Sequence, residues 1–173
     1  MKVDKAELFP VVDESGNVIG SATRGECHSG AKLLHPVVHL HVIDERGRIL
    51  LQKRSMLKDI QPGRWDTAVG GHVDFGETVH DALLREVSEE IGIDASAATL
   101  LTSYLFESAR EREMVNTFIL HVNSDARFNA PADEIDELRF WHIDEIEANL
   151  ANGTFTPNFV QEFTTILLPH LRS

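Results

Sequence analysis

Cysteine is almost absent from this sequence, because Cys27 is the only one in 173 residues. An intrachain disulfide is therefore impossible, and the reducing cytoplasm is the expected compartment. The sequence also lacks an apolar run long enough to span a membrane. Its first residues, MKVDKAELFPVV, do not show the charged and then apolar pattern of a signal peptide. These absences predict a cytoplasmic protein with no membrane partner.

Positive charge is scarce as well: 16 lysines and arginines stand against 28 aspartates and glutamates, a formal net charge of −12. Binding to long nucleic acid depends mainly on lysine and arginine, so this class of partner is disfavoured. A small phosphorylated ligand is compatible with the composition, because metal ions can supply the positive charge. The length and a hydrophobic content of 42% suit one domain with a proper core, which we expect over residues 1–173.

The pattern of apolar and turn residues predicts a mixed α/β domain with a long crossover helix at residues 78–91. Thr78 can cap this helix at its start, and Gly92 can end it. The expected strands are a hairpin at 7–24 within an N-terminal hairpin-and-loop segment (1–34), an antiparallel pair at 35–44 and 48–53, a short strand at 65–73, a second pair at 99–107 and 114–122, and a strand at 136–143. The other segments are a loop or short helix at 24–34, loops at 54–64 and 127–133, a short helix capped by Asp144, and a terminal helix at 157–171.

Glutamates of the expected helix fall on or beside its apolar face. At about 100° per residue, one stripe is apolar, and it consists of Val79, Ala82, Leu83 and Val87. Glu86 and Glu90 fall in the middle of this stripe, and Glu89 lies at its edge beside Arg85. Inward-facing carboxylates repel one another unless a cation compensates them, and a hard divalent ion such as Mg²⁺ takes oxygen ligands of this kind. The alternative is an ordinary acidic helix that faces the solvent.

The loop and helix together carry a family resemblance. Gly71, Glu77 and the run REVSEEIGI at residues 85–93 fill every fixed position of the 23-residue Nudix box, which this stretch resembles over its whole length. The resemblance implies a Nudix-type α/β/α sandwich with a mixed β-sheet. It also implies hydrolysis of a nucleoside diphosphate linked to another group, with Mg²⁺ or Mn²⁺ as the cofactor.

The resemblance gives several residues of the box a role. The implied metal ligands are Glu86, Glu89, Glu90 and the backbone carbonyl near Gly71. Glu77 and Arg85 are expected to brace the loop against the helix. Because one of the helix glutamates often activates water in this family, Glu86 and Glu89 are the catalytic candidates. The loop carboxylate Glu134 is an alternative base.

A second set of candidate ligands is scattered along the sequence and consists of His28, His35, His72, Glu111 and Glu113. Three imidazoles and two carboxylates suit Mn²⁺, Zn²⁺ or Mg²⁺, whereas each histidine taken singly can equally be a surface or hydrogen-bonded residue. The segments around them are similar to type I isopentenyl diphosphate isomerase, itself a Nudix-fold enzyme. The similar segments are His28-x6-His35, RGRILLQKRS at 46–55, Pro62-Gly63-x-Trp65, Gly71-His72 and Glu111-x-Glu113. This resemblance implies a second metal site at the five residues and a diphosphate contact from Arg54 and Lys58.

The departures from the isomerase pattern favour hydrolysis. The isomerase has a catalytic cysteine where this chain has Gly70, and a tryptophan where it has Asn158. Cys27 lies far upstream of that position and is not expected to substitute for the missing thiol. We therefore interpret the chain as a metal-dependent pyrophosphohydrolase of a small organic diphosphate, such as a nucleotide. The alternatives are an isomerase-like enzyme for isoprenoid diphosphates and a non-catalytic diphosphate-binding module, and a homodimer is compatible with the resemblance.

Overall fold

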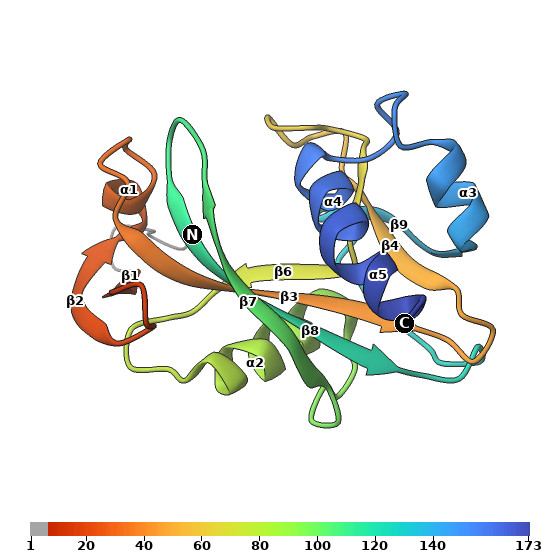
Figure 1. Cartoon of the computed structure of the whole chain (residues 1–173), viewed down its shortest axis with the longest axis horizontal. Helices are drawn as coiled ribbons and strands as arrows, with labels where there is room; N and C mark the ends of the chain where they lie inside the picture. The colour runs from red at the N-terminus through yellow and green to blue at the C-terminus, as the bar shows by residue number, and fades with distance from the viewer. Residues whose placement is uncertain (1–6) are drawn as a thin grey trace. The chain divides into compact units, whose positions relative to one another are not determined.

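The structure is a computed structural model that describes residues 7–173. It consists of two compact units (Figure 1). Unit 1 comprises the described residues up to Leu40 together with Val69–Leu120, and unit 2 comprises His41–Ala68 and His121–Ser173. The first six residues of the expected N-terminal segment lie outside the described part. Among the helices of residues 7–173, none is both long and apolar enough to cross a bilayer.

Unit 1 begins with the expected hairpin. β1 (Leu8–Val12) and β2 (Val18–Thr23) are antiparallel and form a two-stranded sheet. The turn between them is held by Asp13, whose carboxylate accepts hydrogen bonds from the backbone N–H groups of Ser15 and Asn17, both at 2.9 Å. A single turn of helix, α1 (Arg24–Cys27), follows β2, so the sequence prediction for both segments is confirmed.

Four strands of a separate, seven-stranded sheet lie wholly or partly in unit 1. β3 (Leu34–Ile43) begins in unit 1 and ends in unit 2. β6 (Val69–His72) lies antiparallel to it, with Val37 opposite His72. β7 (Thr99–Glu107) and β8 (Arg112–His121) form the expected second antiparallel pair. Nine of the ten residues of β3 are buried, so this strand is covered on both faces, although one face carries His35, His39 and His41.

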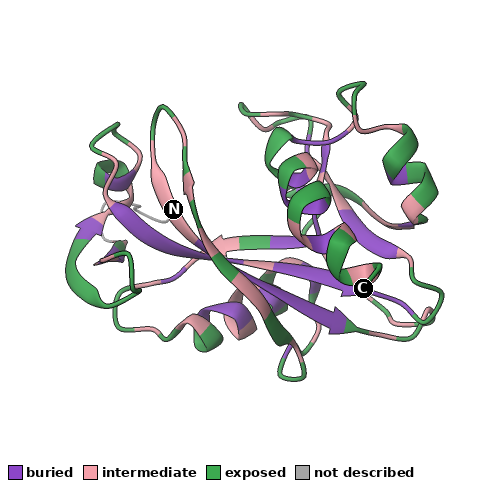
Figure 2. Cartoon of the chain, in the orientation of Figure 1, coloured by how far each residue is buried: buried purple, intermediate pink, exposed green. Residues whose placement is uncertain are grey.

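The helix α2 (Val79–Ile91) has the ends that the sequence predicts. The hydroxyl of Thr78 accepts a hydrogen bond from the N–H of Asp81 at 3.0 Å, and Gly92 ends the helix in the left-handed conformation at φ 71°. The residues buried on this helix are Ala82, Leu83, Val87 and Ile91. They form the purple stripe on α2 in Figure 2, and the opposite side is exposed. The apolar stripe is therefore confirmed, and it continues to Ile91.

Unit 2 is built around β4 (Ile49–Arg54). β5 (Trp65–Thr67) and β9 (Ile135–Trp141) both pair with it antiparallel, and the end of β3 pairs with its first residue. The helices of this unit are α3 (Ile143–Ala148), α4 (Pro157–Glu162), the π-helix η2 (Phe163–Leu167) and α5 (Leu168–Leu171). Phe155, Phe159 and Phe163 are buried in a row, with ring centroids 5.3 and 5.6 Å apart.

Two expected elements are interrupted. The strand expected at 65–73 divides at Ala68, because β5 pairs with β4 whereas β6 pairs with β3. The terminal helix expected at 157–171 contains the π-helix η2 in its middle. In this segment the hydroxyls of Thr164 and Thr165 donate to the carbonyls of Val160 and Gln161 at 2.8 and 2.7 Å, which competes with regular helical bonding.

Several expected boundaries were wrong by one or two residues, among them the end of the strand expected at 136–143, which is Trp141. Two others are informative. β8 begins at Arg112, two residues earlier than expected, so Glu113 belongs to the strand itself. The cap of α3 is His142 and not Asp144. Glu145 is the reason for this shift, since its carboxylate accepts a hydrogen bond from the N–H of His142 at 3.0 Å and starts the helix earlier.

Candidate active site

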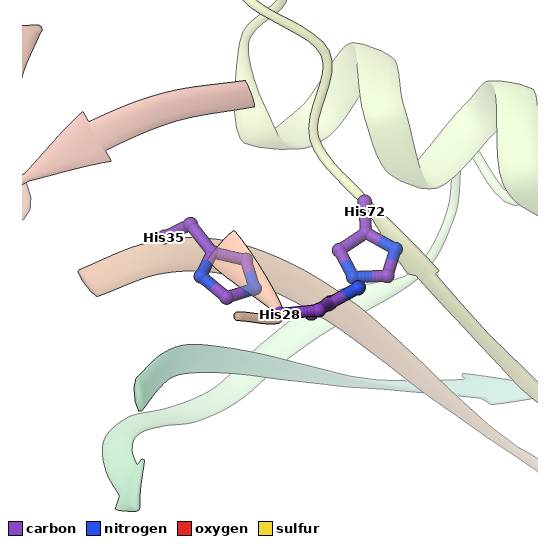
Figure 3. Close-up of side chains that lie close together, drawn as sticks. All are labelled: His28, His35 and His72. Atoms are coloured by element: carbon purple, nitrogen blue, oxygen red, sulfur yellow. The ribbon is translucent and has the colours of Figure 1, made fainter. Parts of the chain in front are cut away.

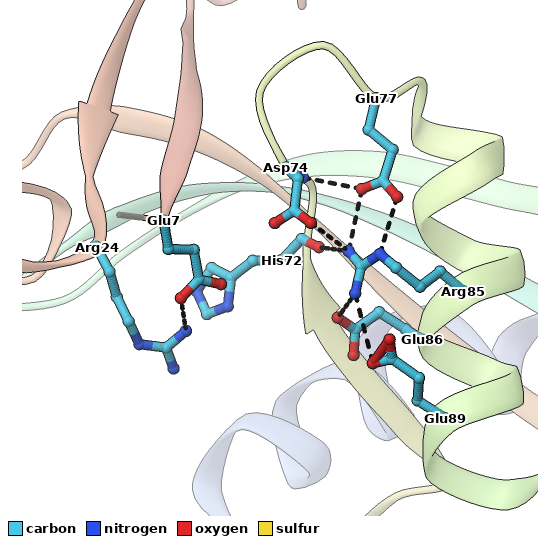
Figure 4. A network of polar contacts seen from close by, with 8 residues as sticks. All are labelled: Glu7, Arg24, His72, Asp74, Glu77, Arg85, Glu86 and Glu89. Carbon is cyan, nitrogen blue, oxygen red and sulfur yellow. Dashed lines mark hydrogen bonds and ion pairs between the residues drawn. The ribbon is translucent and has the colours of Figure 1, made fainter. Parts of the chain in front are cut away.

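Arg85 on α2 is the centre of a polar network in unit 1 (Figure 4). Its guanidinium donates to both carboxylate oxygens of Glu77, at 2.8 and 3.0 Å, and to the backbone carbonyl of His72 at 3.0 Å. Glu77 in turn accepts a hydrogen bond from the N–H of Asp74 at 2.9 Å. The hydrogen bonds from Arg85 lower the pKa of the Glu77 carboxyl, despite its partial burial. The network therefore ties the loop after β6 to the middle of α2.

The same arginine also holds the glutamates of the box. Its Nη1 lies 2.6 Å from Glu86 Oε1 and 3.7 Å from Glu89 Oε2. The side chain of Glu86 is 16% exposed and that of Glu89 is 61% exposed, so only the first lies against the protein. Glu90 is half-buried on the same helix. The sequence places Glu86 in the middle of the apolar stripe of the helix and Glu89 at its edge, and the exposed fractions of the two side chains agree with this.

The lack of a side chain at Gly71 lets Glu86 pack where it does. A Cβ atom added at Gly71 would lie 2.3 Å from the carboxyl carbon of Glu86. Real Cβ atoms do not approach other atoms so closely, so any side chain here would displace the carboxylate. Glu86 thus packs directly on the backbone of β6, next to the carbonyl that the family resemblance implies as a ligand.

A second cluster gathers the scattered histidines (Figure 3). His28 is the C-cap of α1, His35 lies on β3 and His72 lies on β6. Their ring centroids are 5.3 to 5.7 Å apart. Glu111 Oε2 lies 3.0 Å from His28 Nε2, and Glu113 Oε2 lies 3.9 Å from His35 Nε2. The structure therefore brings together all five residues of the second candidate set.

The donor atoms of this cluster fit a divalent metal ion. Within residues 7–173, His28, His35 and His72 form one set of three ligand atoms that lie within 4.8 Å of one another, and His35, Glu111 and Glu113 form another. The Nε2 atoms of His35 and His72 are buried and have no hydrogen-bond partner. His35 donates from Nδ1 to the carbonyl of Leu33 at 2.9 Å, which leaves the lone pair on Nε2.

Burial sets the protonation of the cluster. It lowers the pKa of His35 and, more strongly, that of His72, so both rings are neutral and able to coordinate. Burial, with a smaller effect from the nearby Glu111, raises the pKa of Glu113 to about 7. A bound cation would compensate for the burial of these polar groups, whereas hydrogen bonds within the described chain do not.

Arg54 and Lys58 lie in unit 2, where each already contacts a carboxylate. Arg54 donates from Nε to the carbonyl of Ile60 at 3.0 Å, and its Nη1 lies 3.8 Å from Asp66. Lys58 Nζ lies 2.9 Å from Glu134, the alternative base. The side chain of Glu134 is 58% exposed, so it is a solvated partner of the lysine. A phosphate group that binds either cation would therefore compete with these contacts.

Cys27 does not resemble a reactive thiol. It is fully buried in a small cluster with Phe9 and Ala22. Burial, followed by the charges of two glutamates, raises its pKa to about 11, which keeps the sulfur protonated at neutral pH. The thiol is therefore inert, as the sequence predicts. It does not replace the catalytic cysteine that the isomerase has at the position of Gly70.

Two contacts of the site were not predicted. Phe9 of β1 stacks on His72 with ring centroids 4.5 Å apart and the planes parallel. Asp74 lies 3.5 Å from Arg85 and adds a further carboxylate to the network. No local signal in the sequence indicates the first contact, because it joins residues 63 positions apart. The second contact could have been predicted from the sequence, since Asp74 lies inside the box.

Comparison with known proteins identifies the family of this chain. The model of the NUDIX domain matches residues 33–163. The Isopentenyl-diphosphate Delta-isomerase of Brevibacterium linens is 30% identical over 92% of this chain and 91% of that protein. An uncharacterized Nudix hydrolase of Listeria monocytogenes, lmo0368, is 31% identical over 88% of this chain and 90% of that protein. For two other curated relatives, the match spans only 51% and 59% of their length.

The fold is also found among solved structures. The crystal structure of DR0079 from Deinococcus radiodurans is similar, with a TM-score of 0.78, 23% identity, and coverage of 92% of this chain and 99% of that chain. The chain belongs to the Nudix family and has the Nudix fold, of the α/β class with a mixed β-sheet. It is a Nudix hydrolase, an enzyme class that acts on acid anhydrides in phosphorus-containing substrates. Nudix enzymes generally use divalent metal ions.

Proposed function

We propose that this enzyme hydrolyses the diphosphate linkage of a small organic diphosphate, with a nucleoside diphosphate linked to another group as the first candidate, and uses Mg²⁺ or Mn²⁺. The observation that carries this proposal is the position of Glu86. Arg85 holds its carboxylate and the backbone of Gly71 packs against it, next to two further glutamates of the same helix. This is the arrangement of oxygen ligands that hard divalent ions share with substrate phosphates.

The roles of the chain's own residues follow from their contacts. Glu86, Glu89, Glu90 and the Gly71 carbonyl would hold the metal, which would offset the charge of the diphosphate and lower the pKa of a water molecule. Glu86 or Glu89 would take a proton from the attacking water. As the new P–O bond forms, the bridging P–O bond breaks and the leaving phosphate keeps its electron pair. Glu77 and Arg85 would keep the loop fixed during this exchange.

The histidine cluster supports a second metal site. Its two buried, unpaired Nε2 atoms are the specific observation in favour, together with the two carboxylates beside them. An isomerase-like activity on an isoprenoid diphosphate is the second candidate function, because a relative of that name is 30% identical over most of this chain. Gly70 counts against it, since moving protons on a carbon skeleton needs an acid and a base, and glycine offers neither.

The test is a product assay across nucleoside di- and triphosphates, nucleotide sugars, dinucleotides and isopentenyl diphosphate, with Mg²⁺ or Mn²⁺. We expect metal-dependent release of phosphate or a monophosphate, and a loss of about 100-fold or more in kcat in the Glu86→Gln and Glu90→Gln variants. Glu147→Gln is the matched control, because Glu147 is an exposed glutamate of α3. It should keep wild-type activity.

Other outcomes separate the alternatives. Conversion of isopentenyl diphosphate to its dimethylallyl isomer without release of phosphate would overturn hydrolysis in favour of the second candidate. Hydrolysis that survives both glutamate substitutions would contradict the roles given to the box. Metal and diphosphate binding without turnover of any member of the panel would favour the binding module.

A further inference from the structure

β7 is an edge strand of the seven-stranded sheet, because it pairs with β8 alone among the strands of residues 7–173. Edge strands offer backbone groups to other chains, and proteins commonly protect them with charged residues, proline or bulges. β7 contains no proline, and its one charged residue is Glu107 at its end. The irregularity in its pairing is confined to residues 100–102, so residues 102–107 form a regular strand. The outer edge of β7 is therefore open to a further strand.

The pairing with β8 decides which backbone groups of β7 point outward. The N–H of Ser108 donates to the carbonyl of Glu111 at 2.9 Å, so these residues begin the ladder as a hydrogen-bonded pair. Hydrogen-bonded and non-hydrogen-bonded pairs alternate along an antiparallel ladder. In the register of β7 and β8, the N–H and C=O groups of Ser103 and Leu105 therefore point away from β8. These groups make no hydrogen bond to another segment of the described chain.

A cavity of about 560 Å³ lies beside this edge, and every residue that lines it belongs to unit 1. Its apolar wall comes from the β1–β2 hairpin, the box loop, the start of α2, and the strands β7 and β8. Members of this wall are Pro10, Val12, Val18, Val73, Leu105 and Met114. Val18 is 60% exposed and Leu105 is 44% exposed, so the wall continues to the surface. An exposed apolar surface next to an open strand edge is typical of an interaction site.

We propose that a second copy of this chain occupies this surface, with β7 paired antiparallel to β7 in a homodimer. A two-fold axis makes such an interface self-complementary, and Ser103 of each copy exchanges both backbone hydrogen bonds with Leu105 of the other. The axis is perpendicular to the sheet, so the cavities of the two copies open on the same side. Leu105 of each copy then lies opposite Ser103 of the other, which lines the cavity, and covers the mouth of that cavity.

The charges favour a second copy as the occupant. Two chains that each carry a formal net charge of −12 repel one another least where the contact is uncharged, and residues 95–106 contain no charged side chain. A diphosphate does not suit the cavity, because its lining includes the carboxylates of Glu14 and Glu77 and no lysine, arginine or histidine among the described residues. The inference therefore does not depend on the proposed function.

The test is light scattering during size-exclusion chromatography of the full chain, from micromolar to submillimolar concentration. We expect the wild type to have twice the chain mass of 19.4 kDa. Leu105→Lys places a charge in the apolar contact, and Leu105→Pro removes an N–H that points away from β8. Each should raise the dissociation constant at least about 10-fold. Leu57→Lys is the matched control, because Leu57 is 84% exposed and belongs to unit 2, and it should dimerise as the wild type does.

Hydrogen exchange of the wild type is a second measurement that needs no variant. The amides of Ser103 and Leu105 should exchange more slowly in the concentrated sample than in the dilute one. The amides of Tyr104 and Phe106 point toward β8 and should be protected in both. Equal exchange of Ser103 and Leu105 in the two samples of a dimer that dissociates on dilution would contradict the inference.

Two results of the mass measurement would overturn the inference as well. A wild type that stays monomeric at every concentration would leave the edge to a strand of another protein, or the cavity to a small apolar ligand. A dimer that survives both substitutions of Leu105 would show that another surface holds the copies together. Thermal unfolding identifies any variant that fails to fold, and hydrogen exchange then decides the result.

Discussion

The guanidinium of Arg85 bonds to three parts of unit 1, namely the Glu77 carboxylate, the Glu86 carboxylate and the backbone carbonyl of His72. Only a planar group with several fixed N–H donors can make all of these bonds at once, so lysine is not an equivalent here. The family resemblance indicated the first pair, and the structure adds the contact with His72. One side chain thereby orients both the box loop and a candidate ligand.

The first prediction at the scale of single residues concerns Glu77. We expect Glu77→Gln to lower the free energy of unfolding at pH 7 by about 1–3 kcal/mol, because Arg85 loses a charged partner. Arg85 lowers the pKa of Glu77 below its ordinary value of 4.5 in the folded protein. The stabilisation is therefore present above pH 4.5 and is lost as the pH falls through the folded-state pKa.

Urea unfolding in the presence of a chelator, at pH 7 and at a series of pH values below 4.5, measures how this stabilisation depends on pH. The difference in the free energy of unfolding between wild type and variant should be full at pH 7 and should shrink as the pH falls. A difference that grows as the pH falls would show that the Glu77–Arg85 contact does not stabilise the fold in the way its geometry indicates.

At the scale of elements, α2 is the segment that its own sequence specifies most completely. Thr78 begins it, Gly92 ends it, and the buried stripe has the helical period. The interrupted segments are different. The break at Ala68 depends on which strand each half pairs with, and β4 and β3 are both distant in sequence. Neither partner can be identified from residues 65–73 alone.

Gly92 gives a prediction for this helix. It has φ 71°, a conformation that costs residues with a Cβ about 1–2 kcal/mol. We expect Gly92→Ala to reduce the free energy of unfolding by about this amount, and Gly92→Asn to reduce it less. Gly20→Ala on β2 is the control, because a Cβ there meets no atom within 4 Å and the backbone is not left-handed. Denaturant titration of the three variants checks the order, and equal losses at both glycines would contradict it.

At the scale of the whole molecule, the second candidate site joins segments that are far apart in the chain. His28 and Glu113 are 85 positions apart, yet both belong to one cluster in unit 1. An ion bound there would link α1, β3, β6 and β8, and such an ion stabilises the folded state by its binding free energy. The cytoplasmic location, the homodimer and the single domain over residues 1–173 stay predictions.

Thermal unfolding with Mn²⁺ tests this linkage. At a concentration about a hundredfold above the dissociation constant, binding contributes about 2.7 kcal/mol, which raises Tm by about 5–10 °C for a chain of this length. His72→Ala should lose most of the increase, and His80→Ala should keep it. An increase that His72→Ala retains in full would assign the stabilising ion to the box glutamates and not to the histidine cluster.

The sequence by itself determined the features that depend on neighbours within a few positions. The ends of α2, the apolar stripe of α2 and the hairpin of β1 and β2 follow from capping, turn and periodicity rules that act locally. The motif spacing of the box was also enough to identify the Nudix family, which the comparisons confirm.

Only the tertiary structure decided which distant side chains meet. The pairing of β3 with β6 brings His35 beside His72 and His39 beside Gly70, and no local rule fixes this register. The same pairing buries the Nε2 atoms of two histidines while it leaves a third imidazole half-exposed. Burial and exposure are properties of the packed sheet, so the closed histidine cluster appears only once the strands are assembled.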